Sequence, residues 1–237
     1  MFVWSRFFEI FPKIIVKFPV TLQIVLVTYI MALVLGSVLA MVRIKKIPVL
    51  NQIVSVLISY VRCTPVISQL FVVYFGVPMV VTALGYSSKV VDNLVYVYIA
   101  FSINTGCFLA EIIRSALTAV PYGQTEAGRS IGLTNFQTFY SIVIPQAFHI
   151  ALPMLGTSFI LLFKATALAY MVGVMDMIGK VKSLGAVSGH TLEGYLACAL
   201  VFAVISLTME QIFNLINKRM DFSRMHRAIT RKAVKAK

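Results

Sequence analysis

The chain has 237 residues, of which 59% are hydrophobic and only 12% are charged. Soluble domains carry about 25% charged residues, so this composition excludes an ordinary soluble protein. The net charge of +13 would by itself favour a nucleic-acid partner, but eight of the 21 basic residues lie after Asn217. A basic run after an apolar segment is typical of a cytoplasmic topology signal that contacts membrane lipid, so we expect no nucleic acid.

Residues 1–17 show an amphipathic pattern. Arg6, Glu9, Lys13 and Lys17 recur every three or four residues, with Phe and Ile between them. This spacing is typical of a helix that lies in the membrane interface. It is equally compatible with the flank of a first membrane span.

Five apolar segments are predicted to span a membrane: 18–42, 49–78, 91–117, 152–172 and 194–216. About 20 apolar residues cross the hydrocarbon core, and their backbone groups must pair within the segment, so unbroken apolar runs predict helices and exclude a barrel. The fold class is an all-α membrane protein with about five transmembrane helices in residues 18–217. The basic tail 218–237 is expected in the cytoplasm. An odd number of spans then places the N-terminus outside and the C-terminus inside.

The loop between the third and fourth spans, residues 118–145, has a compact pattern of helix signals. Thr125 is predicted to cap a short helix, which Gly132 ends by adopting a left-handed conformation. Thr134 and Gln137 have the spacing of a capping box, which predicts a second helix that re-enters the membrane. A small preformed loop of this kind suits docking into a groove on a soluble partner.

The same loop resembles the signature loop of permease subunits of bacterial ATP-binding-cassette importers. That signature is Glu-Ala-Ala, three residues, Gly, nine residues, Ile, one residue and Leu-Pro. At the same spacing the chain has Glu126, Ala127, Gly128, Gly132, Ile142, Ile144 and Pro145. It departs from the signature twice, with Gly128 in place of Ala and Ile144 in place of Leu.

Further segments are similar to the polar amino acid uptake subfamily of these permeases, and the similarity extends over most of the chain. The subfamily usually has Gly where Cys63 stands. The similar segments are Arg62–Pro65, Gln69–Phe71, Tyr74–Gly76, Ala110–Arg114, Val120-Pro121, Gly123-Gln124 and Leu161–Lys164 with Thr166 and Leu168.

The resemblance implies a type I ABC importer permease fold, in a multi-pass protein of the bacterial cytoplasmic (plasma) membrane. Two permease subunits would form the pathway, with a homodimer favoured over a heterodimer. An extracytoplasmic solute-binding protein would deliver the solute. The loop 118–145 would then be a coupling loop that docks on a cytosolic ABC ATPase subunit through Glu126, Ala127, Gly128, Gly132, Ile142 and Pro145.

The expected function is therefore that of a permease subunit that translocates a polar amino acid or a derivative such as cystine. The chain itself would be non-catalytic and would hold no cofactor, because the partner ATPase binds ATP and Mg. The alternative function is an ATP-independent secondary transporter or channel. Which amino acid is carried stays open at this stage.

Polar residues inside the predicted spans are candidates for the translocation pathway, because a charge at bilayer depth costs at least about 2.5–3.5 kcal/mol and usually faces a watery cavity. The candidates are Arg62, Thr64, Gln69, Glu111 and Lys164. Pro65 predicts a helix kink beside Arg62, and a broken helix beside a cation can meet a carboxylate. The alternative for Arg62 is a structural ion pair with Glu111. Glu111 and Arg114 lie three residues apart on one helix face and are interpreted as structural, as is Glu210.

No metal or nucleotide site is predicted in the chain. The three histidines and three cysteines have no metal-ligand spacing, and we interpret the cysteines as small buried hydrophobes: His149, His190, His226, Cys63, Cys107 and Cys198. The run from Gly173 to Lys180 resembles a phosphate-binding loop, but it has one intervening residue too many, and Val181 replaces the Ser or Thr.

Overall fold

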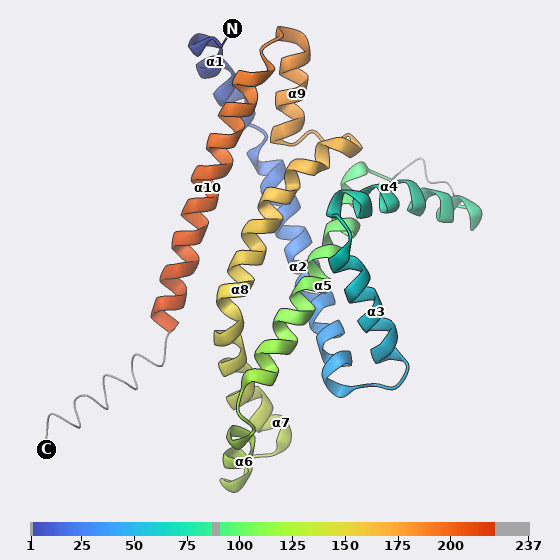
Figure 1. Cartoon of the computed structure of the whole chain (residues 1–237), viewed down its shortest axis with the longest axis vertical. Helices are drawn as coiled ribbons and strands as arrows, with labels where there is room; N and C mark the ends of the chain where they lie inside the picture. Colours follow the sequence, from blue (N-terminus) through green and yellow to red (C-terminus); the bar gives the residue numbers. More distant parts are fainter. Residues whose placement is uncertain (1, 87–90, 221–237) are drawn as a thin grey trace, which may run out of the picture.

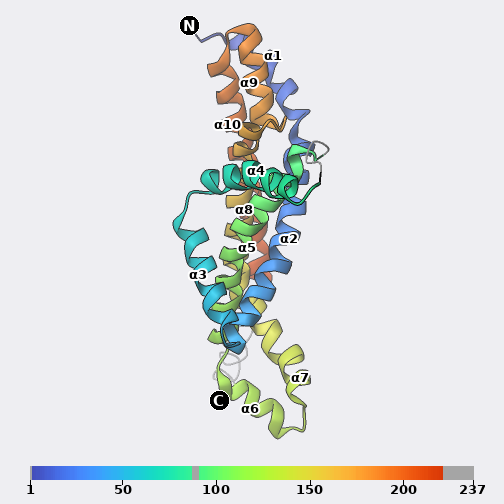
Figure 2. The same ribbon diagram turned by 90° about the vertical axis from the view of Figure 1, so that its right-hand side faces the viewer.

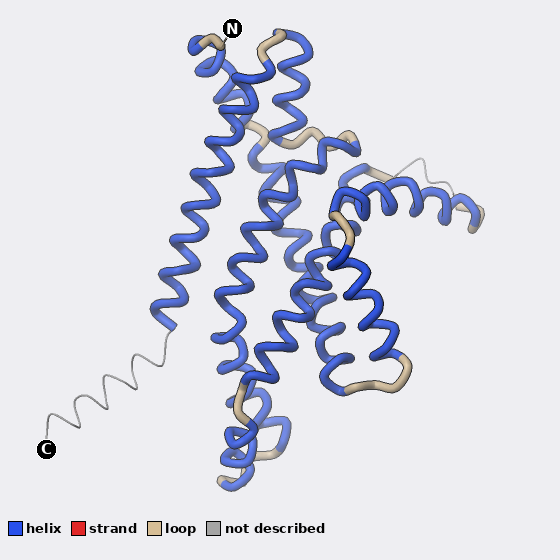
Figure 3. The backbone as a smooth tube through the Cα atoms, viewed as in Figure 1, coloured by secondary structure: helices blue, strands red, loops and turns tan. Residues whose placement is uncertain are grey.

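The computed structural model describes residues 2–86 and 91–220, and Figure 3 shows only helices and loops there. The predicted basic tail from residue 221 onward lies outside the described residues. Two irregular turns join the main helices, a π-helix η1 (Phe139–Val143) and a 3-10 helix η2 (Thr166–Val172). The α-helices are α1 (Trp4–Ile15), α2 (Phe18–Lys45), α3 (Leu50–Cys63), α4 (Val66–Ala83), α5 (Asn93–Ala119), α6 (Tyr122–Ser130), α7 (Asn135–Thr138), α8 (Ile144–Ala165), α9 (Met177–Ser188) and α10 (Thr191–Met220).

Five helical segments of the described chain are long and apolar enough to cross a membrane, which confirms the predicted number. They are Phe18–Lys45, Val66–Ala83, Asn93–Ala119, Asn135–Val172 and Thr191–Arg219. The fourth segment is longer than predicted, because α7, η1, α8 and η2 follow one another without a break from residue 135. The coupling loop is therefore continuous with a membrane helix.

A bundle of α2, α5, α8 and α10 forms the body of the molecule (Figure 1). The helices α2 and α5 pack with their backbones close together, since a methyl group on Gly36 would lie 2.9 Å from the carbonyl oxygen of Gly106. On the other side, α10 packs on α8, where Phe213 covers Gly156. Small residues at such contacts let membrane helices approach closely, and van der Waals packing then holds them together.

The predicted second span 49–78 is not one helix but two, α3 and α4. Thr64 is extended (φ −108°, ψ 144°) and Pro65 precedes α4, so the expected kink is a complete break. The cause is local, because proline lacks an N–H donor and disfavours the helical conformation in the residue before it. Figures 1 and 2 show α4 lying across the long helices rather than alongside them. Leu70 is its one fully covered residue.

At the end opposite the coupling loop, α1 packs against α9 and α10 (Figure 1). Residues 4–15 form a separate helix, and Phe7, Ile10 and Ile14 on its apolar face are buried. Protein therefore covers much of the face that the amphipathic pattern assigned to lipid. The helix α9 lies between the predicted fourth and fifth spans and was not predicted.

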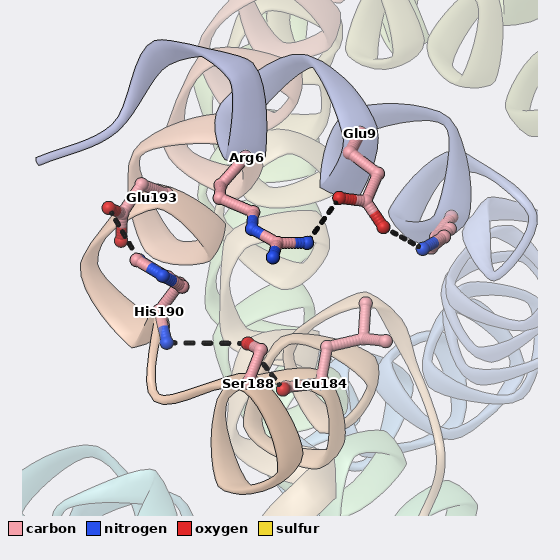
Figure 4. Close-up of polar contacts among 7 residues, drawn as sticks. Arg6, Glu9, Leu184, Ser188, His190 and Glu193 are labelled. Atoms are coloured by element: carbon pink, nitrogen blue, oxygen red, sulfur yellow. Dashed lines mark hydrogen bonds and ion pairs between the residues drawn. The ribbon is translucent and has the colours of Figure 1, made fainter.

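A polar contact ties this end together. The buried Glu193 accepts the backbone N–H of Val3 at 3.0 Å, and its Oε1 lies 3.0 Å from Nδ1 of His190 (Figure 4). The prediction that all three cysteines are buried is correct for Cys107 and Cys198 but wrong for Cys63, which is exposed at the end of α3. That residue stands at the break between α3 and α4, where neither helix covers it.

Candidate functional site

The coupling loop projects beyond the bundle as two short helices (Figures 1 and 2). The first, α6, begins at Tyr122 after Pro121 (φ −59°, ψ 135°), so Thr125 lies inside the helix and does not cap it as predicted. The earlier start has a simple reason. A proline just before a helix sacrifices no hydrogen bond, because the first N–H groups of a helix are unpaired anyway.

The turn between the two short helices has the predicted geometry. Gly132 has φ +88°, and its N–H donates to the Arg129 carbonyl at 2.9 Å. The capping box is complete, because the Gln137 N–H donates to Thr134 Oγ1 at 3.2 Å and the Thr134 N–H donates to Gln137 Oε1 at 2.9 Å. Both predictions depended on residues close in sequence, and both are confirmed.

Two signature residues hold the loop in shape. Gly128 is buried against the segment that follows, where a Cβ atom would lie 2.6 Å from Thr138 Cγ2 and 3.1 Å from Ile142 Cδ1. The departure from Ala at position 128 therefore allows α6 to approach η1 closely. The other candidate residues Glu126, Ala127, Gly132 and Pro145 are exposed and available to a partner.

An apolar surface on the loop was not singled out from the sequence. Tyr122, Ile131, Phe136 and Tyr140 are each between 65% and 75% exposed, and the rings of Phe136 and Tyr140 stack with centroids 6.2 Å apart. The signal was present, since these large apolar residues lie in a loop outside the predicted spans. Large exposed apolar residues on a loop that projects from the bundle favour a protein-interaction surface.

Thr64 and Gln69 meet at the break between α3 and α4. Gln69 Nε2 donates to Thr64 Oγ1 and to the Val61 carbonyl, both at 2.7 Å. Asn104 on α5, which sequence reasoning missed, donates from Nδ2 to Gln69 Oε1 at 3.0 Å. The helix break leaves the Val61 carbonyl without its helical N–H partner, and Gln69 supplies a donor in its place. The same network connects the break to α5 through Asn104.

A cavity of about 240 Å³ lies beside this network, between α5 and α8. Its polar lining comes from Asn104 and Thr105 on one side and Thr157 and Ser158 on the other. Phe108 also lines it, and the Arg62 guanidinium carbon lies 5.5 Å from the centre of that ring. Three of the predicted pathway residues, Arg62, Thr64 and Gln69, are therefore close to one cavity.

Glu111 belongs to a different group of side chains. Its carboxylate binds Arg114 at 2.7 Å, as predicted, and also Arg43 of α2 at 3.1 Å. The proposed ion pair between Arg62 and Glu111 is wrong, because both carboxylate oxygens are bound to these other two guanidinium groups. Glu111 is largely buried in this ion-pair cluster and does not line the cavity between α5 and α8.

Lys164 lines a second cavity, of about 300 Å³, between α8 and α10. Glu210, Asn214 and Asn217 line the same cavity from α10. Within the described residues, neither Lys164 nor Glu210 is part of an ion pair. Thr157 and Leu161 of α8 line both cavities, so the two spaces are neighbours on α8 and these two residues lie between them.

Among residues 2–86 and 91–220, no group of three or more metal-ligating side chains is close enough to hold an ion. The run that resembles a phosphate-binding loop begins with Gly173 in a left-handed conformation and leads into α9. Asp176 caps that helix, with its Oδ1 accepting the Gly179 N–H at 2.7 Å. Burial raises the pKa of Asp176 to about 6, from an ordinary value of 3.8. A carboxylate therefore occupies the position that a phosphate would need.

Residues 32–222 match a protein family described as binding-protein-dependent transport system inner membrane component. The L-cystine transport system permease protein TcyL of Bacillus subtilis is 38% identical over 208 residues, which are 88% of this chain and 87% of that protein. The probable amino-acid permease protein YxeN of the same organism is 36% identical over 92% of this chain and 96% of its own length.

A solved structure is also similar to this fold. The crystal structure of an amino acid ABC transporter with histidines has a chain that matches with a TM-score of 0.81 and 26% sequence identity. The match covers 92% of this chain and 99% of that one.

Proposed function

The chain belongs to the family of binding-protein-dependent transport system inner membrane components, and from this premise we propose that it carries a polar amino acid, or a derivative such as cystine, across the cytoplasmic membrane. It is a multi-pass permease subunit of an ATP-binding-cassette importer, with the fold of a type I importer permease. The substrate class is supported by its relatives, since TcyL is a permease for L-cystine and YxeN is a probable amino-acid permease.

The projecting coupling loop carries the mechanism that we propose. Its exposed residues Tyr122, Ile131, Phe136 and Tyr140 would enter a groove on the cytosolic ATPase subunit, with Glu126 and Ala127 beside them. The partner would bind ATP and Mg and perform the hydrolysis, while this chain makes and breaks no covalent bond.

Movement of the loop has a direct route into the membrane. The α6 helix is locked to η1 through Gly128, and η1 is continuous with α8. Because Thr157 and Leu161 of α8 line both cavities, closure of the ATPase pair would shift one wall of each cavity at the same time. We assign the pathway to these cavities, with Arg62, Thr64 and Gln69 near the first and Lys164 in the second.

A second permease subunit would cover the arm formed by α3 and α4. Large apolar residues of α4, among them Val72, Phe75 and Met79, are more than half exposed because the helix extends away from the bundle (Figure 1). We propose a homodimer and an extracytoplasmic solute-binding protein that delivers the solute to it. Two differently tagged copies of this chain, expressed together with the ATPase, should co-purify in one complex. A heterodimer would leave each tag in a separate complex.

The decisive experiment measures ATPase activity of the reconstituted complex in lipid nanodiscs, with and without binding protein loaded from a panel of amino acids that includes cystine. We expect stimulation by the cognate solute. Phe136→Ala should reduce both ATPase binding and stimulation at least tenfold, because it removes an exposed aromatic anchor of the interface. The matched control is Phe8→Ala, an equally exposed aromatic residue at the opposite end of the molecule. Solute flux in liposomes without any ATPase would favour the secondary transporter instead.

A further inference from the structure

A third cavity, of about 420 Å³, lies where α2, α5 and α8 meet near the coupling loop. Its volume is within the range of about 300–1,000 Å³ that is typical of ligand pockets. Of its lining residues only Ser37 carries a polar side chain; the others include Leu33, Met41, Leu117, Phe139 and Ile144. It shares no lining residue with the other two cavities.

The position of this cavity places it in one half of the membrane. Met41 and Leu117 lie close to the ends of α2 and α5 that adjoin the coupling loop. Phe139 is the first residue of η1 and Ile144 the first of α8. Ser37 and Phe148 on its lining are exposed, so the cavity opens on the outside of the bundle, where hydrocarbon chains of the adjoining leaflet surround the protein.

A positive charge lies just beyond the open, apolar space. Lys45 follows Met41 by four residues, which places it one helical turn closer to the membrane surface on a neighbouring part of the same helix face. Both Lys45 and Lys46 are exposed, and within the described residues neither is part of an ion pair, whereas nearby Arg43 is bound to Glu111. Basic groups at the cytoplasmic side of a pocket between membrane helices attract anionic lipid headgroups.

We propose that this cavity binds one acyl chain of an anionic phospholipid, whose headgroup is held by Lys45. The apolar lining matches a hydrocarbon chain, and the uncompensated ammonium group one turn away matches a phosphate. The helices α3 and α4, which carry the surface assigned to the second permease, contribute no residue to the lining. The proposal depends on the membrane fold and not on which solute is transported.

Binding at this place would act on coupling. Phe139 and Ile144 are the first residues of η1 and of the helix that follows it, so a bound chain would contact the junction between the coupling loop and α8. Isolated π-helical turns within longer helices are uncommon and are frequent at functional sites. An occupied cavity would hold this junction in one arrangement, and ATPase stimulation would then depend on anionic lipid.

Native mass spectrometry of the complete complex, released from nanodiscs of phosphatidylglycerol and phosphatidylcholine, tests the proposal. Ser37→Phe places an aromatic ring in the cavity and should reduce retained lipid several-fold. Val38→Phe, the next residue on the exposed side of α2, does not line the cavity and should have no effect. Lys45→Gln should remove the preference for phosphatidylglycerol, while Lys180→Gln, the same charge change on α9, should preserve it.

The outcomes separate the proposal from its competitors. Equal lipid retention in Ser37→Phe and the wild type would overturn it, as would an unchanged preference in Lys45→Gln. Disulfide cross-linking between two Ser37→Cys copies would show that a second permease, and not lipid, covers the cavity. The measured quantity is retained lipid, which does not depend on the transported solute. The lipid result therefore stays interpretable even if the ATPase assay of the proposed function fails.

Discussion

Replacing Gly128 by Ala restores the residue that the importer signature has at this position, and we predict that it weakens the coupling loop. The new methyl group would lie 2.6 Å from Thr138 Cγ2 and 2.9 Å from Thr138 Oγ1. Carbon atoms in favourable contact lie about 3.5–4.0 Å apart, so one side has to shift by about 1 Å. Thr138 is fully buried, so a shift of its side chain has to displace its neighbours.

The free energy lost in Gly128→Ala follows from two opposing effects. Ala is favoured over Gly inside a helix by about 1 kcal/mol. Overpacking a close contact costs about 1–3 kcal/mol, so the net loss at this site is about 1 kcal/mol. If the loop must keep its shape to bind the ATPase, that loss corresponds to about fivefold weaker binding. This loss is measured directly as the affinity of the purified ATPase subunit for the permease in nanodiscs.

The same helix provides the control. Gly123 also lies in α6, but a Cβ atom there meets nothing within 4 Å, so Gly123→Ala should leave the affinity unchanged or slightly improve it. Adding Thr138→Ala to Gly128→Ala removes both atoms of the closest contact and should restore binding. Wild-type affinity in Gly128→Ala, together with no energetic coupling to Thr138→Ala, would refute the packing argument.

Three further changes test other parts of the fold. Gly36→Ala would bring a methyl group within 2.9 Å of the Gly106 carbonyl oxygen, and should lower the melting temperature in detergent through a loss of about 1–3 kcal/mol. Thr134→Ala removes the capping box and should speed amide hydrogen exchange in α7, since a lost cap costs about 1 kcal/mol. Asp176 binds a proton more tightly when folded, so its own contribution to the free energy of unfolding should fall by about 3 kcal/mol as pH rises from about 3 to about 7. Asp176→Asn keeps an acceptor for the Gly179 N–H but cannot titrate, so the melting temperature of the wild type should fall relative to that of this variant as pH rises over that range.

Features set by neighbours in sequence were predicted well. The apolar spans, the left-handed Gly132 and the capping box of Thr134 and Gln137 each depend on a few consecutive residues. The break at Pro65 was predicted at the right residue but was underestimated as a kink, because its final angle depends on how Gln69 and Asn104 pair across it.

Contacts between segments that are distant in the sequence could not be predicted from residue spacing. Glu111 has two arginines within reach, and its pairing with Arg114 follows from helix spacing, whereas its pairing with Arg43 requires α2 to lie against α5. Arg62 likewise lies over the Phe108 ring because α3 packs against α5. Sequence spacing carries no information about either approach, so the pathway candidates could be listed but not grouped.

The grouping shows why one helix is central to the proposed transport cycle. The coupling loop continues through η1 into α8, whose Thr157 and Leu161 separate a cavity with neutral polar groups from one that contains Lys164 and Glu210. A helix is stiff along its axis because its backbone is hydrogen-bonded from turn to turn, so displacement at the end of α8 next to the coupling loop would reach both cavities. The irregular turn at residues 139–143 is the least regular part of that connection, and the proposed lipid touches it at Phe139. Loop docking and lipid binding would therefore both act on residues 139–143. Through α8, both would change the shape of the two cavities.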